Sequence, residues 1–300
     1  MSKKSNLSGR QKTKNAYDSV KRAGEVAKVV CRGGQRKYHR FRPARFYGGI
    51  ATADCVGCCL QCLFCWSWPK VISPQRYGRF YTPEEVAAKL THIVRKKGFH
   101  QARISGNEPT ISREHLIKVI ERIPSDIRFI LETNGIPIGY DYTYAVDLVR
   151  FKNLYVRISL KGCDEAEFST LTGALPQGFE LQLKALENLC RTGVNVHPAV
   201  MVSFSPSAKE RGLRKKLSAI RREFEHIEIE ELVLYGDVEK RLSKAGIEYR
   251  SAYSPIQPKR HSHRSGLKNN GISVLNMPLE SNRGEYCAEH ERNIHVIAPN

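Results

Sequence analysis

Apolar positions follow two alternating patterns along the middle of this chain. Five short apolar runs have the length and β-branched content of buried strands: 99–105, 127–133, 154–160, 194–204 and 229–236. Between them, apolar residues spaced three and four apart predict helices: 83–97, 112–123, 141–150, 178–193 and 208–224. Strands that alternate with helices predict a parallel sheet with right-handed crossovers.

The ends of these elements are also marked in the sequence. The run 82–85 is a capping box with proline at the first helical position, and Gly98 marks the end of that helix. Residues 46–54 predict a first strand that leads directly into a cysteine-rich loop. About six strand–helix units result, too few for a closed eight-stranded barrel. We therefore expect an α/β fold with a partial (β/α)6-type parallel barrel.

The two ends of the chain differ in composition from this core. Residues 1–45 contain 14 Lys and Arg against two acidic residues, and contribute +12 of the net charge of +19. We expect a flexible basic arm at 1–45, with a short strand at 26–30, followed by the core at 46–236. Residues 237–300, whose last fifty are rich in Pro, Ser, Asn and His, predict an irregular C-terminal extension.

The charge and hydropathy of the chain narrow its partners and its location. A strongly basic arm favours an anionic partner, most commonly RNA or DNA, although a solubilising tail has the same composition. No apolar run approaches the ~20 residues of a membrane span, and the basic start lacks the apolar segment of a secretory signal. We expect a cytoplasmic protein with reduced thiols.

Five cysteines within eleven residues are the strongest chemical signal: Cys55, Cys58, Cys59, Cys62 and Cys65. Thiolates this close in sequence hold a metal or a metal cluster far more often than they form disulfides. The spacing Cys58-x3-Cys62-x2-Cys65 supplies three thiolates, which would leave one iron of a [4Fe-4S] cluster open to a small molecule. Cys55-x3-Cys59-x2-Cys62 has the same spacing and is the alternative frame.

Polar segments follow the next three predicted strands. They are the runs SGNEP at 105–109, ETNG at 132–135 and SLK at 159–161. Ligands bind at the carboxyl ends of the strands in parallel α/β sheets. We therefore expect these segments to meet the cysteine loop at one edge of the sheet.

These motifs together resemble the radical SAM (S-adenosylmethionine) superfamily. The run 57–65 is similar to its CxxxCxΦC loop, with Phe64 at the aromatic position, which favours the frame ending at Cys65. SGNEP is similar to the GGEP motif, with Asn107 in place of a glycine. ETNG resembles the branch that contains glycyl-radical activating enzymes and 7-carboxy-7-deazaguanine synthase. The resemblance covers about residues 46–235.

The resemblance implies an oxygen-sensitive enzyme with a [4Fe-4S] cluster on Cys58, Cys62 and Cys65. It implies reductive cleavage of SAM to a 5′-deoxyadenosyl radical, with electrons from a low-potential donor of the ferredoxin or flavodoxin type. The implied SAM contacts are Ser105, Gly106 and Glu108 for the methionyl amino group, and Asn134, Ser159 and Lys161 for ribose or carboxylate. No catalytic residue beyond these is assigned.

The sequence leaves the substrate and several residues open. RNA or a nucleoside, a protein or peptide, and a small heterocycle are all compatible substrates. A zinc-binding nucleic-acid module is the alternative class, because Cys55-x2-Cys58 and Cys62-x2-Cys65 resemble two zinc knuckles. The remaining aromatic and histidine candidates are each as compatible with packing or solvation as with ligand binding: Trp66, Trp68, His197, His261, His263 and His290.

Overall fold

The computed structural model describes residues 16–255 and 273–276, and its centre is a parallel sheet. Six parallel strands lie side by side in chain order: β3 (Ile50–Cys55), β5 (Gln101–Gly106), β6 (Arg128–Thr133), β7 (Leu154–Leu160), β8 (Val196–Met201) and β9 (Glu228–Glu230). The described strands do not close into a ring, because β9 ends the sheet on one side. The predicted partial parallel barrel is confirmed.

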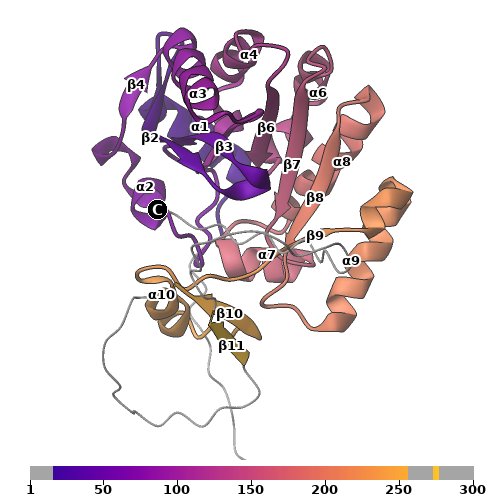
Figure 1. Ribbon diagram of the computed structural model, residues 1–300. Helices are drawn as coiled ribbons and strands as arrows, with labels where there is room; N and C mark the ends of the chain where they lie inside the picture. Colours follow the sequence, from indigo (N-terminus) through magenta and orange to yellow (C-terminus); the bar gives the residue numbers. More distant parts are fainter. Residues whose placement is uncertain (1–15, 256–272, 277–300) are drawn as a thin grey trace, which may run out of the picture.

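Helices cover the convex face of this sheet (Figure 1). The predicted ones are present: α3 (Pro83–Lys97), α4 (Arg113–Glu121), α6 (Tyr142–Leu148), α8 (Gln177–Thr192) and α9 (Ser207–Ile220). The capping box at Thr82 and Glu85 forms, and Gly98 ends α3 in the left-handed conformation. Short helices were not predicted: α2 (Trp68–Ile72), α5 (Ile136–Tyr140), α7 (Glu165–Thr172), α10 (Val238–Lys244) and the 3-10 turns η1 (Phe46–Gly48), η2 (Pro74–Arg76), η3 (Pro109–Ile111) and η4 (Arg222–Glu225).

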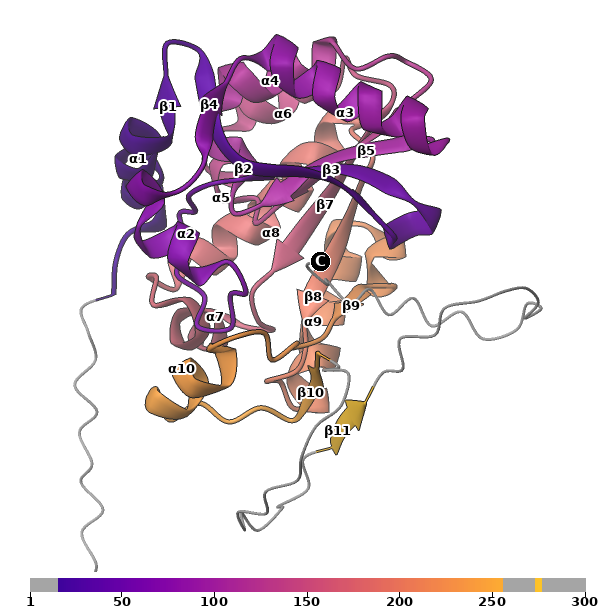
Figure 2. The same cartoon turned by 60° about the vertical axis from the view of Figure 1, so that its left-hand side comes forward.

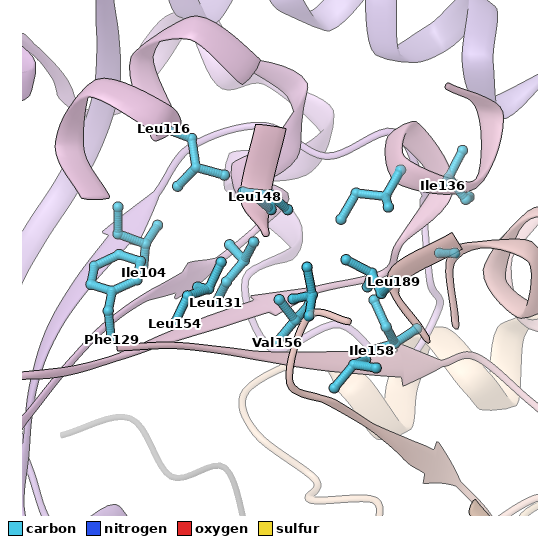
Figure 3. Packing of buried hydrophobic residues seen from close by; sticks show 14 of the residues in the cluster. Ile104, Leu116, Phe129, Leu131, Ile136, Leu148, Leu154, Val156, Ile158 and Leu189 are labelled. Carbon is cyan, nitrogen blue, oxygen red and sulfur yellow. The ribbon is translucent and has the colours of Figure 1, made fainter. Parts of the chain in front are cut away.

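The core lies between the sheet and these helices. Figure 3 shows strand residues such as Leu131 and Val156 packed near Leu148 and Leu189 from the helices, all of them fully buried. Because side chains alternate along a strand, the residues between these apolar positions point to the concave face. Near the carboxyl ends of β5 to β7 those residues are charged or polar, and they line the interior of the open barrel.

The N-terminal segment corrects the expected arm. Residues 19–30 form helix α1 (Ser19–Val30) rather than a coil with a strand at 26–30, because Asp18 caps the first turn and Val26 and Val30 pack on Val56. After β1 (Cys31–Arg32), strand β2 (Gln35–Ala44) pairs antiparallel with β3 and with β4 (Arg79–Tyr81). Residues 1–15 lie outside the described part.

The chain after β9 also differs from the expectation. The strand predicted at 229–236 ends at Glu230, because the following residues pair with β10 (Ser251–Ser254) through Val233 and Tyr253. Strand β10 pairs in parallel with β11 (Ser273–Asn276), next to α10 below the barrel (Figure 2). The histidines 261, 263 and 290 fall outside the described residues. None of the described helices is long and apolar enough to cross a membrane.

Candidate active site

The cysteine loop lies at the carboxyl end of β3, where a cavity of about 140 Å³ opens. Cys58, Cys62 and Cys65 line this cavity. Cys55 is fully buried and its thiol donates to the Ser105 carbonyl oxygen at 3.0 Å. Cys59 is also fully buried and does not line the cavity. The fold therefore brings together the three thiols of the motif Cys58-x3-Cys62-x2-Cys65. Two thiols of the alternative motif, Cys55 and Cys59, lie away from the cavity.

Cys62 is buried at the cavity, and Cys58 and Cys65 are partly buried. Burial raises the pKa of Cys62 well above its ordinary value and that of Cys65 to about 11, and neighbouring thiolates add to both shifts. Bound iron would offset this cost, because a metal stabilises thiolates. Among the described residues, no group of three or more Cys, His, Asp or Glu converges on a position for one metal ion, as zinc would require. Three thiols at one cavity are the soft donors that an iron–sulfur cluster takes.

The SGNEP turn packs tightly against the cysteine loop. Gly106 has φ +95°, and a Cβ there would lie 2.8 Å from the Cys55 nitrogen, so only glycine fits. Asn107 does not adopt a positive φ, and its Oδ1 accepts a hydrogen bond from the Gly57 N–H at 3.0 Å. The Glu108 N–H donates to the Gly57 carbonyl oxygen, also at 3.0 Å. The asparagine that replaces the motif's glycine thus joins the two loops.

The Glu108 carboxylate is fully buried and joins two strand ends. Its oxygens accept from the N–H and hydroxyl of Thr110, the hydroxyl of Thr133 and the N–H of Asn134, at 2.5–3.0 Å. Burial raises the pKa of this carboxyl, and the four donors oppose that shift. The structure therefore shows Glu108 organising the turns of β5 and β6.

Asn134 bridges this turn and the cysteine loop. Its Nδ2 donates to the Cys59 sulfur at 3.3 Å, and its Oδ1 accepts from the Ile136 N–H at 3.0 Å. Asn134 also lines the cavity. The Asn-Gly dipeptide therefore serves both as a turn and as part of the wall.

The inner face of β7 carries a buried charge network centred on Glu230. Arg157 donates to Glu230 at 2.6 Å, Ser159 donates to it at 2.6 Å, and Lys161 lies 3.3 Å from it. Burial opposes ionisation of Glu230, but Lys161 and Arg157 outweigh it and hold its pKa below the ordinary value. Arg157 and Ser159 of β7 and Lys161, which follows the strand directly, meet at Glu230, as their alternation predicts.

All of the predicted SAM-contact residues line the same cavity: Ser105, Gly106, Glu108, Asn134, Ser159 and Lys161. His197 lies outside it and hydrogen-bonds Glu228 at 2.5 Å, which is one of the two interpretations the sequence left open. Sequence reasoning missed the acidic wall formed by Glu132, Glu230 and Glu231. The signal was present, because two of these glutamates, Glu132 and Glu230, lie on inner-face positions of predicted strands.

A residue of the C-terminal segment also reaches the cysteine loop. Arg241 of α10 donates to the Leu63 carbonyl oxygen at 3.0 Å and to the Cys65 carbonyl oxygen at 2.6 Å. Its guanidinium carbon lies 5.0 Å from the centre of the Trp68 ring. Trp66 lines the cavity, whereas Trp68 does not. No local pattern marks Arg241, because its partners lie about 180 residues away in the chain.

Comparison with known proteins agrees with this geometry. The sequence profile of the Radical SAM superfamily matches residues 54–205, from the end of β3 to just beyond β8. The chain belongs to the radical SAM superfamily. It is therefore an enzyme of a family that uses a [4Fe-4S] cluster and SAM.

Individual relatives are distant. The chain is similar to the probable GTP 3',8-cyclase of Pyrococcus horikoshii, 29% identical over 117 residues, which is 39% of this chain and 35% of the relative. It is 30% identical over 118 residues to that of Thermoplasma volcanium, 39% of this chain and 33% of the relative. The aligned part thus spans about a third of these relatives. They support the superfamily rather than a particular branch of it.

A solved structure supports the fold. Streptococcus suis SuiB bound to its precursor peptide SuiA has a TM-score of 0.50 at 14% identity, over 69% of this chain and 48% of that chain. At this identity the likeness concerns the fold alone.

Proposed function

We propose that this radical SAM enzyme holds its [4Fe-4S] cluster on Cys58, Cys62 and Cys65. The observation that carries the assignment is that these three thiols line the cavity, while Cys55 and Cys59 are fully buried away from it. When bound, the reduced cluster supplies the electron that splits SAM into methionine and a 5′-deoxyadenosyl radical, which abstracts hydrogen from a substrate. A zinc-binding module is disfavoured, because both cysteine pairs lie within one loop, whereas structural zinc sites normally draw their pairs from separated segments.

The strand ends supply the groups that would bind SAM. Lys161 brings a cation to the cavity wall and suits the methionyl carboxylate, and the Ser159 hydroxyl and the Asn134 amide suit polar groups of the ribose. Ser105 and the open backbone at Gly106 suit the amino group. Glu108 acts through the turn that it organises, since its carboxylate oxygens already accept four hydrogen bonds.

The remaining assignments follow from the same proposal. Residues 46–236 form the catalytic core, electrons come from a ferredoxin or flavodoxin in the cytoplasm, and oxygen inactivates the open cluster. The ETNG turn supports the branch of glycyl-radical activating enzymes and 7-carboxy-7-deazaguanine synthase. The substrate is RNA or a nucleoside, a protein or peptide, or a small heterocycle. The name of the GTP 3',8-cyclase relatives supports a nucleotide among these.

Four single variants test the cluster assignment. We expect Cys65→Ala and Cys62→Ala to lose the iron–sulfur absorbance and 5′-deoxyadenosine production after anaerobic reconstitution. Cys55→Ala should keep both, because its thiol bonds a strand carbonyl. Cys190→Ala, on α8 and away from the cavity, controls for the loss of any thiol. Loss in Cys55→Ala with retention in Cys65→Ala would refute the assignment and favour the other frame.

A further inference from the structure

A surface outside the catalytic cavity carries an excess of positive charge. Residues 26–53 and 66–82 together contain ten Lys and Arg and no acidic residue, whereas residues 83–255 contain 26 Lys and Arg against 23 acidic residues. The two acid-free segments lie together in the fold, because β4 pairs with β2 and α1 contacts β1 and η2 (Figure 2). The positive charge is therefore concentrated at the antiparallel extension of the sheet.

Four cations of this extension are exposed, and we call them the basic patch: Lys28 of α1, Arg32 of β1, Arg76 of η2 and Arg79 of β4. None of the four makes an ion pair within the described part of the chain. Cations on the helices of the convex face include several with a glutamate partner one turn away, such as Lys118 with Glu114. A surface of one sign attracts a partner that carries many negative charges.

Aromatic side chains lie among these cations. The Arg32 guanidinium carbon lies over the Phe80 ring, 4.4 Å from its centre, and Phe80 and Tyr77 are themselves partly exposed. An arginine plane or an aromatic ring is a platform on which an unpaired base stacks. An acidic protein would satisfy the charges but has no bases to stack there, and a duplex keeps its bases stacked inside. The combination therefore favours a single-stranded nucleic acid.

The basic patch is continuous with the cavity wall. Segment 66–82 carries Trp66 and Val71, which line the cavity, and also Arg76 and Arg79 of the patch. Helix α2 and the turn η2, which hold these residues in sequence, contact each other. A strand bound along the patch can therefore reach the cavity without crossing the helical face of the barrel.

We propose that the basic patch docks a single-stranded nucleic acid, RNA or DNA, with its phosphates on the four cations and a base stacked on Arg32. The bound strand delivers one of its nucleotides to the cavity as the substrate, and this part of the inference rests on the proposed radical SAM function. Docking itself needs neither SAM cleavage nor an electron donor. The surface is built from folded helices and strands rather than from a flexible arm.

Fluorescence anisotropy measures the docking. The full chain, reconstituted anaerobically, is titrated into a fluorescein-labelled RNA decamer of mixed sequence at several salt concentrations. The DNA decamer of the same sequence, the duplex of that sequence and an acidic decapeptide are titrated in the same way. A patch variant replaces all four patch cations with glutamine. A matched control variant loses the same charge from exposed positions on α3 and α9, through glutamine at positions 96, 97, 211 and 215.

We expect the patch variant to bind the single strand at least about thirtyfold more weakly, and its salt slope to fall by about 3, because each phosphate contact releases roughly 0.7 counterion. The control variant should keep the affinity and the slope of the unaltered protein. Arg32→Lys keeps the charge but loses the plane, so it should weaken binding several-fold at an unchanged salt slope. Tighter binding of the RNA or of the DNA decamer identifies which nucleic acid the patch docks.

The inference is overturned if the patch variant and the control variant bind the single strand with the same affinity and salt slope, or if Arg32→Lys binds like the unaltered protein. Patch-dependent binding that is as tight for the duplex, or tighter for the acidic peptide, would also overturn it. 5′-Deoxyadenosine production, measured without any added strand, is scored separately. A protein that docks the strand through the patch but never cleaves SAM would refute the proposed function and leave the docking surface standing.

Discussion

Arg241 offers the clearest test of whether the C-terminal segment orders the cysteine loop. Arg241→Gln removes two hydrogen bonds to loop carbonyls and the contact with the Trp68 ring. A hydrogen bond from a charged donor contributes roughly 1.5 kcal/mol or more, and a partly exposed cation–π contact about 0.5 kcal/mol. Glutamine and water replace part of these lost interactions, so we expect the closed conformation of the loop to be destabilised by about 2 kcal/mol. This raises the equilibrium constant for loop opening roughly thirtyfold.

Hydrogen exchange measures that opening directly. Amides of residues 63–68 should exchange roughly thirtyfold faster in Arg241→Gln, while those of β5 to β7 stay protected. The reconstituted variant should also release iron to a chelator faster, since Cys65 lies in the loosened segment. Arg241→Lys keeps the charge, and its exchange and iron-release rates should lie between those of the unaltered protein and of Arg241→Gln. Arg211→Gln, exposed on α9, is the matched control. The reasoning would be refuted if amides of residues 63–68 exchange, and iron is released, at the same rates in Arg241→Gln as in Arg211→Gln.

Two further predictions concern the strand ends and the charge network. In the folded protein the pKa of Glu228 is lowered to about 2, because the His197 hydrogen bond and Arg157 outweigh the opposing effect of burial. Because the pKa of Glu228 is lower in the folded protein than in the unfolded chain, its carboxylate stabilises the fold above about pH 4.5. This stabilisation is lost as the pH falls toward 2. As the pH falls through this window, Glu228→Gln should therefore lose less unfolding free energy than the unaltered protein, by up to about 3 kcal/mol. The exposed control Glu248→Gln should behave like the unaltered protein. Identical midpoints of acid unfolding in the two variants would contradict the prediction. Gly106→Ala should cost at least about 2 kcal/mol in urea unfolding, because its Cβ would meet the Cys55 backbone at 2.8 Å and φ is +95°. Gly212→Ala, in open space on α9, should instead be neutral or slightly stabilising, and equal effects at the two glycines would show that the close approach is not real.

The parallel core could be predicted from the sequence because its signals are local. Buried parallel strands need apolar runs, and helices on one face need a repeat near 3.6, so both patterns are written within a few residues. The same holds for the Thr82 capping box and the Gly98 stop. Helix α1 was missed although its local signals were present: Asp18 is an N-cap residue, and Val26 and Val30, four residues apart, form the face that packs on Val56.

The amino-acid sequence alone determined the order of strands and helices, the edge of the sheet where polar groups gather, and the presence of closely spaced thiols. Only the tertiary structure placed Cys58, Cys62 and Cys65 at one cavity and turned Cys55 and Cys59 away from it, since spacing does not say which thiols turn into the core. It also decided that Glu230 binds Ser159 and that Arg241 reaches Cys65. The physical reason is that such contacts depend on how distant elements pack, and packing is a property of the whole fold.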